Sequence, residues 1–188
     1  MVTRLFTSDA GFASQLEVFL AARQVDEASV DSAVAAILAD VRKRGDDAVL
    51  DFTARFDRLA LTPATMRVSE AELEAATKAV APEAFAALSF AAERIRTYHA
   101  ALLPKDLEWT DAAGVRLGAR FTPIGAVGVY VPGGTAAYPS SVLMNTLPAK
   151  LAGVERVVMV VPSPEGKLNP LVLAAAKLAG ADEIYRIG

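Results

Sequence analysis

Two adjacent glycines stand where a predicted strand meets a predicted helix. Residues 126–131 form a nearly continuous apolar run, Gly133 and Gly134 follow it, and a helical pattern opens at Ser140. Glycines let the main chain approach a ligand closely and present its N–H groups, and the start of a helix attracts anions such as a pyrophosphate. The loop therefore suits nucleotide binding. Its spacing departs from G-x-G-x-x-G, so a tight turn that needs glycine only for its geometry stays an alternative.

The acidic residue that such sites usually offer to a ribose is not evident in the sequence. It commonly stands at the end of the second strand of a dinucleotide-binding unit. Here that strand ends at residues 160–162, Val-Val-Pro, and the nearest acidic residue is Glu165. The residue pattern by itself leaves dinucleotide binding open.

Other residues with catalytic chemistry are scarce. The chain has no cysteine and one histidine, His99, which excludes disulfides, thiolate metal sites, a cysteine nucleophile and a histidine-rich metal site. Ser140 and Ser141 have no histidine near them in the sequence, so we do not expect a serine hydrolase. We expect a packing or capping role for His99. Lys150, near a helix end, could contact a phosphate or remain solvated.

The second half of the chain predicts an α/β fold. Its apolar runs and helical patterns alternate in the order 126–131, about 140–152, 156–161, about 168–179 and 183–187. Such apolar runs are typical of parallel strands that are covered on both faces and joined by right-handed crossovers. The β-α-β-α-β order predicts an incomplete Rossmann-like unit over residues 124–188, with ligands at the carboxyl ends of its strands. We expect the last strand to leave an open edge that pairs with a further strand.

The first half predicts a helical region over residues 1–104, followed by a β-hairpin over 105–123. Asp26 is a candidate N-cap for a helix over 27–44, and Gly45 is a candidate stop. The apolar residues of this helix recur at the spacing of one buried face: Val30, Val34, Ile37, Leu38 and Val41.

Three more helices and the hairpin have local signals. A short helix carries its apolar side around 49–56, and Ser69 with Glu72 fits a capping box for a helix from Glu70. Pro82 suits the first position of a helix that runs toward Leu102. Alternating residues at 107–110 and 115–121 surround a turn with Gly114, which predicts the hairpin.

Composition narrows the class of protein. The 188 residues are 53% hydrophobic with a mean hydropathy of +0.34, which is typical of a globular chain with one domain or a domain plus an arm. The net charge of −3 argues against nucleic-acid binding. The N-terminus lacks a signal-peptide pattern, and the most apolar stretch, 154–162, is too short to span a bilayer. We therefore expect a soluble cytoplasmic protein with no membrane or nucleic-acid partner.

A long and specific stretch carries a family resemblance. Residues 125–153 read GAVGVYVPGGTAAYPSSVLMNTLPAKLAG, and residues 41–50 read VRKRGDDAVL. Together with Phe56-Asp57, and with Ile95 and Tyr98-His99 on the helix before the hairpin, these stretches closely resemble the histidinol dehydrogenase family. The resemblance extends over about 34–188.

The resemblance implies a zinc enzyme that oxidises L-histidinol through the aldehyde to L-histidine with two NAD, in histidine biosynthesis. It also implies a homodimer whose sites mix residues of both subunits, and two incomplete Rossmann-like domains in an aldehyde dehydrogenase-like arrangement. The tyrosine of the family's Tyr-Val-Pro-Gly-Gly loop contacts NAD, which implies a cofactor role for Tyr130. Pro132, Gly133 and Gly134 are implied as its neighbours in the cofactor site.

The same resemblance limits what this chain can supply. The family's zinc ligands, its catalytic Glu-His pair and its next cofactor residue, a glutamine, all fall beyond Gly188. We therefore expect the chain to match the first part, less than half, of a family member, with no catalytic or metal-binding residue and no dehydrogenase activity alone. Two alternatives stay open: a segment of a related zinc- and NAD-dependent dehydrogenase with another alcohol substrate, and a non-catalytic binding or dimerisation module.

Overall fold

A computed structural model describes residues 3–133 and 137–188, apart from the side chains of 22–29. The chain divides into two compact units, Met1–Val49 and Leu50–Gly188. The described part of the chain contains no helix with both the length and the apolarity that crossing a bilayer requires.

The first unit is built on one long helix, α1 (Phe12–Arg44). The predicted N-cap at Asp26 is wrong, because the helix begins after Gly11 and runs through Asp26. Residues 12–25 are mostly good helix formers, so nothing interrupts the helix at that point. The predicted stop is confirmed: Gly45 takes a φ of 62° and donates its N–H to the carbonyl of Val41 at 2.8 Å.

The apolar face predicted for α1 is largely uncovered. Val30, Val34 and Leu38 are 56%, 47% and 49% exposed, so the expectation that they are buried is wrong. The helical spacing of apolar residues gives the direction of a face but does not say what packs on it.

The boundary between the two units falls inside α2 (Asp46–Phe56), and three more helices follow it: α3 (Pro63–Met66), α4 (Glu70–Ala79) and α5 (Pro82–Ala101). Local signals in the sequence predicted α2, α4 and α5. The capping box of α4 is confirmed, because Glu72 donates its N–H to Ser69 Oγ at 3.3 Å and Ser69 donates its N–H to Glu72 Oε2 at 2.9 Å. The short helix α3 was not predicted.

The predicted hairpin is confirmed as β1 (Leu107–Thr110) paired antiparallel with β2 (Arg116–Ala119). Asp111 shapes the turn, because its Oδ1 accepts the N–H groups of Ala113 and Val115, both at 2.9 Å. Gly114 has a φ of 82°, which glycine adopts without strain.

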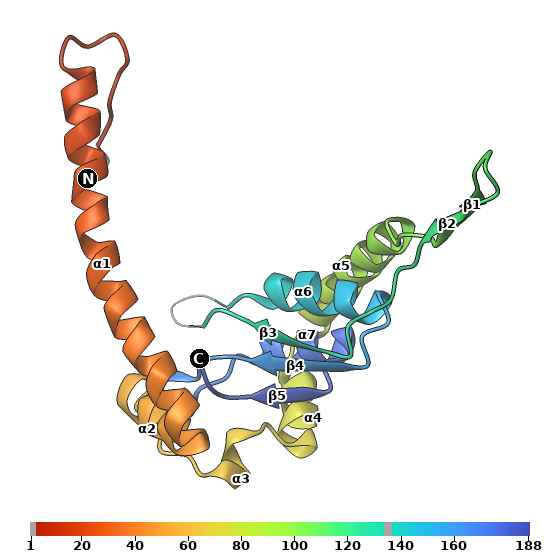
Figure 1. The fold of residues 1–188 in the computed structure, drawn as a ribbon. Coiled ribbons are helices and arrows are strands. Elements are labelled where there is room, and N and C mark those ends of the chain that lie inside the picture. Colours follow the sequence, from red (N-terminus) through yellow and green to blue (C-terminus); the bar gives the residue numbers. More distant parts are fainter. Residues whose placement is uncertain (1–2, 134–136) are drawn as a thin grey trace. The chain divides into compact units, whose positions relative to one another are not determined.

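The second unit then forms a mixed α/β layer around a parallel sheet (Figure 1). In chain order its main elements are β3 (Ala126–Tyr130), α6 (Pro139–Leu151), β4 (Arg156–Val160), α7 (Pro170–Ala179) and β5 (Glu183–Tyr185). The strands lie in the order β3-β4-β5, so the predicted parallel β-α-β-α-β arrangement is confirmed. A single 3₁₀ turn, η1 (Pro164–Gly166), lies between β4 and α7.

The core lies between the sheet and the helices that pack on it. Val157 and Met159 of β4 and Ala174 to Ala176 of α7 are fully buried. The helix α6 packs against α7. The helix α4 packs on α7, and α5 packs on α6. The helix α7 is apolar nearly all round because it is enclosed by other elements.

Two expectations about the sheet are corrected. The strands are not covered fully on both faces, because Gly128 and Tyr130 are exposed and Val158 and Val160 are only partly buried. The edge of β5 is not open, because Val68 donates its N–H to the carbonyl of Ile184 at 2.8 Å. Arg186 also donates its N–H to Met66 at 3.0 Å, and Arg67 bridges Tyr185 in antiparallel pairing. A segment distant in sequence covers this edge, and local patterns carry no signal for such a contact.

Candidate functional site

The loops that follow β3 and β4 leave the sheet side by side. Tyr130 is in register with Val160, and beyond them Val131 donates its N–H to the carbonyl of Val160 at 3.0 Å. In the next pair of strands, Val161 donates its N–H to the carbonyl of Tyr185 at 3.0 Å. The carboxyl ends of the three strands therefore form one edge, which is where open parallel sheets bind ligands.

A cavity of about 340 Å³ lies at this edge. Most of its lining residues are small or apolar: Pro132, Gly133, Ala137, Val161, Pro162, Pro164 and Val172. Its size is near the lower limit of about 300–1,000 Å³ that is usual for ligand pockets. Hollows of comparable size occur on the hairpin and on α5, but this one lies at the carboxyl ends of parallel strands.

Only some of the predicted cofactor residues line the cavity. Pro132 and Gly133 line the cavity. Tyr130 ends β3 with 55% of its surface exposed and is not among the residues that line the cavity. Gly134 lies outside the described residues.

Gly133 is required by the close approach of the two loops. A Cβ at this position would lie 3.0 Å from the carbonyl oxygen of Pro162 and 3.1 Å from its Cβ. A larger residue would therefore push the loops apart and alter the cavity between them. This requirement for glycine comes from close packing. It does not exclude a role of Gly133 in ligand binding.

Three polar residues complete the cavity: Glu165, Lys167 and Asn169. Lys167 donates to Glu165 Oε2 at 2.8 Å, and Arg58 lies 3.1 Å from Oε1 of the same carboxylate. The hydrogen bond from Lys167 lowers the pKa of Glu165, and the charges of Lys167 and Arg58 lower it further. The carboxylate is therefore ionised and partly neutralised at neutral pH.

Asn169 links the cavity to the start of α7. Its side-chain oxygen accepts the N–H of Leu171 at 2.9 Å, which caps the helix, and Pro170 occupies the first turn. The positive end of a helix dipole thus borders the cavity. An apolar lining, a carboxylate, a lysine and a helix start can together bind a nucleoside with an attached phosphate.

Sequence reasoning identified part of this lining. Glu165 was noticed only as the nearest acidic residue after the second strand, and Lys167 and Asn169 were missed. The Asn169-Pro170 pair is a recognisable helix start and could have drawn attention to the loop before it. The contribution of Lys167 depends on how the loop folds, for which the sequence has no signal.

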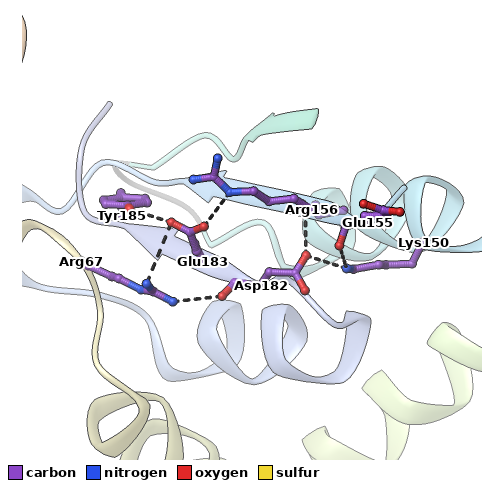
Figure 2. A network of polar contacts seen from close by, with 8 residues as sticks. Arg67, Lys150, Glu155, Arg156, Asp182, Glu183 and Tyr185 are labelled. Carbon is purple, nitrogen blue, oxygen red and sulfur yellow. Dashed lines mark hydrogen bonds and ion pairs between the residues drawn. The ribbon is translucent and has the colours of Figure 1, made fainter. Parts of the chain in front are cut away.

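The opposite end of the sheet carries a network of charged side chains (Figure 2). Glu183 accepts hydrogen bonds from Arg156 Nε and from the Tyr185 hydroxyl, both at 2.7 Å, and Arg67 lies 4.0 Å away. The hydrogen bond from Arg156, followed by that from Tyr185, lowers the pKa of Glu183 to about 2. These groups satisfy one another, so we interpret the network as structural.

Two further candidates from the sequence lie away from the cavity. Lys150 is neither a phosphate contact nor a free solvated lysine, because it forms an ion pair with Asp182 at 2.5 Å in this network. The ring of His99 contacts Tyr98 edge-on, with 5.1 Å between ring centroids, and its Nε2 is buried without a hydrogen-bond partner.

The donors in the described part of the chain do not fit a zinc ion. No three His, Cys, Asp or Glu side chains there gather closely enough to hold a metal. The zinc that the family resemblance implies therefore has no ligand set among the side chains that the structure describes, and we assign it no step.

Comparison with known proteins gives a consistent result. The family model for histidinol dehydrogenase matches residues 20–188. A histidinol dehydrogenase of Gluconobacter oxydans is 60% identical over 185 residues, which are 98% of this chain and 43% of that protein. One of Bradyrhizobium diazoefficiens is 58% identical over 188 residues, covering all of this chain and 44% of that protein.

Solved structures agree with these relatives. The crystal structure of histidinol dehydrogenase from Elizabethkingia anophelis matches with a TM-score of 0.80 and 34% identity, over 85% of this chain and 36% of that chain. The chain thus spans less than half the length of the curated relatives it matches. Neither a dehydrogenase for another alcohol nor a non-catalytic module is favoured by these matches.

Proposed function

The chain belongs to the histidinol dehydrogenase family, and from this premise we propose that it forms a nucleotide-binding part of an enzyme that oxidises L-histidinol to L-histidine with NAD. The observation that carries the proposal is the cavity at the carboxyl ends of β3 and β4, where Pro132 and Gly133 meet Pro162 and Glu165. This is the edge at which doubly wound sheets bind dinucleotides.

The architecture that we propose for the chain is a helical region over 1–104, a hairpin over 105–123 and an incomplete Rossmann-like unit over 124–188. In the whole protein this unit would belong to an aldehyde dehydrogenase-like arrangement. The parallel order β3-β4-β5 and the helices that connect these strands support the proposal.

The cavity suits the adenosine end of NAD. Its apolar lining would pack against the adenine ring, and Glu165 would accept hydrogen bonds from ribose hydroxyls. Gly133 and Gly134 would let the main chain approach the pyrophosphate, and Tyr130 would contact the dinucleotide at the end of β3. Bound NAD supplies the hydride acceptor, and the residues of this chain bind and orient it.

The remaining properties rest on the family. We propose that the whole protein acts on a small-molecule substrate as a cytoplasmic homodimer. The exposed apolar residues along α1, such as Val18 and Val30, would suit a contact with a second copy.

The test is a titration of the isotopically labelled 188-residue chain with NAD, followed by NMR. We expect weak, saturable shifts at the amides of Gly133, Val161 and Glu165, because NAD would bind between the two loops. If these amides do not shift even at the highest NAD concentration that the titration reaches, the proposal is wrong.

Substitution of Tyr130 sharpens the same test. Tyr130→Ala should raise the Kd for NAD in this chain and the apparent KM for NAD in a complete enzyme, because an aromatic contact is lost. Tyr98→Ala is the matched control, since Tyr98 is a similarly exposed tyrosine on α5 that does not line the cavity. Unchanged constants for Tyr130→Ala would remove Tyr130 from the site.

A further inference from the structure

The loop between β4 and α7 is held by a residue far away in the sequence. Ser163 is fully buried and donates its N–H to Oδ2 of Asp57 at 2.8 Å, across a separation of 106 residues. Two residues later, Glu165 donates its N–H to the main-chain oxygen of Asp57 at 2.7 Å. One residue, just after α2, thus fixes two successive points of the loop.

The conformation that Asp57 holds is an unfavourable one for the chain by itself. Glu165 has a φ of 56° and Arg58 a φ of 54°, in the left-handed region that residues other than glycine rarely adopt. Their side chains form an ion pair at 3.1 Å, and Gly166 closes the turn by donating its N–H to Ser163 at 2.8 Å. Non-glycine residues keep such a conformation only where surrounding contacts determine it.

The same loop forms one wall of the cavity, which Pro162, Pro164 and Glu165 line. Pro162 and Pro164 stand on either side of Ser163, whose N–H Asp57 accepts, and Glu165 carries the second N–H that Asp57 accepts. Asp57 itself is not among the lining residues, so any effect that it has on a ligand acts through the loop. Asp57 is in turn anchored, because its N–H bonds to the carbonyl of the buried Thr53 at 2.9 Å.

We propose that Asp57 is a positioning residue of the nucleotide pocket, whose carboxylate and carbonyl hold the wall at residues 162–165 in its binding conformation. The inference rests on the proposed function, because it assumes that the cavity takes NAD. It gives Asp57 a role in ligand binding. The sequence alone does not suggest this role, because Asp57 lies far along the chain from the residues that line the pocket.

The experiment compares variants of the 188-residue chain by their Kd for NAD. Asp57→Ala removes the acceptor for Ser163, so the loop should populate its binding conformation less often. If a tenth of molecules keep that conformation, the Kd rises about tenfold. Asp57→Asn keeps a side-chain oxygen that can accept the same N–H and should bind NAD nearly as the wild type does.

Asp182→Ala is the matched control for a loss of general stability. Asp182 also accepts a main-chain N–H of β4, that of Val157 at 2.6 Å, but it lies at the amino end of the sheet. It should lower the stability of the chain and leave the Kd for NAD unchanged.

The outcomes separate the positioning role from the proposed function. A weakened Asp57→Ala together with an unweakened Asp57→Asn and Asp182→Ala supports the role. An Asp57→Ala that binds NAD like the wild type, or a loss shared equally with Asp182→Ala, overturns it while NAD binding by the wild type stands. A wild-type chain that binds no NAD overturns the proposed function and the positioning role with it.

A second measurement decides the matter if Asp57→Ala does not fold. Amide hydrogen exchange of the wild-type chain without NAD should show Ser163 and Glu165 protected, because Asp57 already holds both amides. Exchange of these two amides at the rate of an open loop would overturn the role, since the wall would then not be positioned before the ligand binds.

Discussion

The two ends of the parallel sheet in the second unit use charged side chains in different ways. At the amino end, Arg156 pairs with Glu183 and Lys150 pairs with Asp182, so these charges neutralise one another. Asp182 also accepts a main-chain N–H, that of Val157. At the carboxyl end, the loops after β3 and β4 enclose a cavity whose polar groups, such as Glu165, remain partly available to a ligand. We therefore expect the amino end to contribute mainly to stability and the carboxyl end, in the proposed function, mainly to NAD binding.

This division has a physical reason. The helices α6 and α7 follow β3 and β4, so their amino ends, which carry the positive ends of the helix dipoles, lie toward the carboxyl ends of the strands and attract anions there. The amino end of the sheet lacks that attraction, so ion pairs can close it without occupying the proposed ligand site. Substitutions at the two ends should therefore separate stability from NAD binding.

The largest effect on stability is expected at the amino end, from Asp182→Ala. Asp182 donates its N–H to the carbonyl of Val157 at 2.9 Å, and its carboxylate accepts the N–H of Val157 at 2.6 Å. Val157 is fully buried, so the lost acceptor should lower the free energy of unfolding by about 2 kcal/mol, measured by urea denaturation.

Asp182→Asn separates the two contributions of this residue. It keeps an acceptor for Val157 and loses only the charge opposite Lys150, so it should cost less than about 1 kcal/mol. Equal losses for both variants would mean that the ion pair, and not the buried amide, provides the stability.

At the carboxyl end, Gly133→Ala is expected to weaken NAD binding, with a smaller free-energy effect than Asp182→Ala has on stability. The added Cβ would press on Pro162 and force the two loops apart, at a cost of about 1 kcal/mol. The Kd for NAD should rise about fivefold as the cavity changes shape, measured by the NMR titration. Gly128→Ala is the control, because a Cβ at Gly128 meets nothing within 4 Å. A Kd that both variants leave unchanged would argue against binding between the loops.

Local patterns predicted most of the fold. The capping box of Ser69 and Glu72, the turn at Gly114 and the stop at Gly45 depend on residues close together in the sequence, so their signals are complete in the sequence. The predicted helix start at Asp26 was wrong because a residue type that favours an N-cap looks the same in the middle of a helix as at its start.

Long-range contacts could not be predicted in this way. The pairing of Arg67 with Tyr185 and the contact of Asp57 with Ser163 join segments more than a hundred residues apart. The site shows the same limit: Gly133 was visible as a glycine after a strand, whereas Lys167 enters the cavity only through the fold of the loop.

The smallest effect is expected from acid, and Glu183 at the amino end should contribute to it. The pKa of Glu183 is lowered from 4.5 to about 2, first by its hydrogen bond with Arg156. A carboxyl group with a lowered pKa in the folded state contributes stability above its unfolded pKa, and this is lost as the pH falls through the folded pKa. The urea midpoint should therefore decline between about pH 5 and about pH 2, and Glu183→Gln should flatten this decline. If Glu183→Gln declines as steeply as the wild type, the acid sensitivity arises elsewhere, and Glu72→Gln is the next variant to measure, because the Ser69 N–H and Arg186 also lower the pKa of Glu72 to about 2.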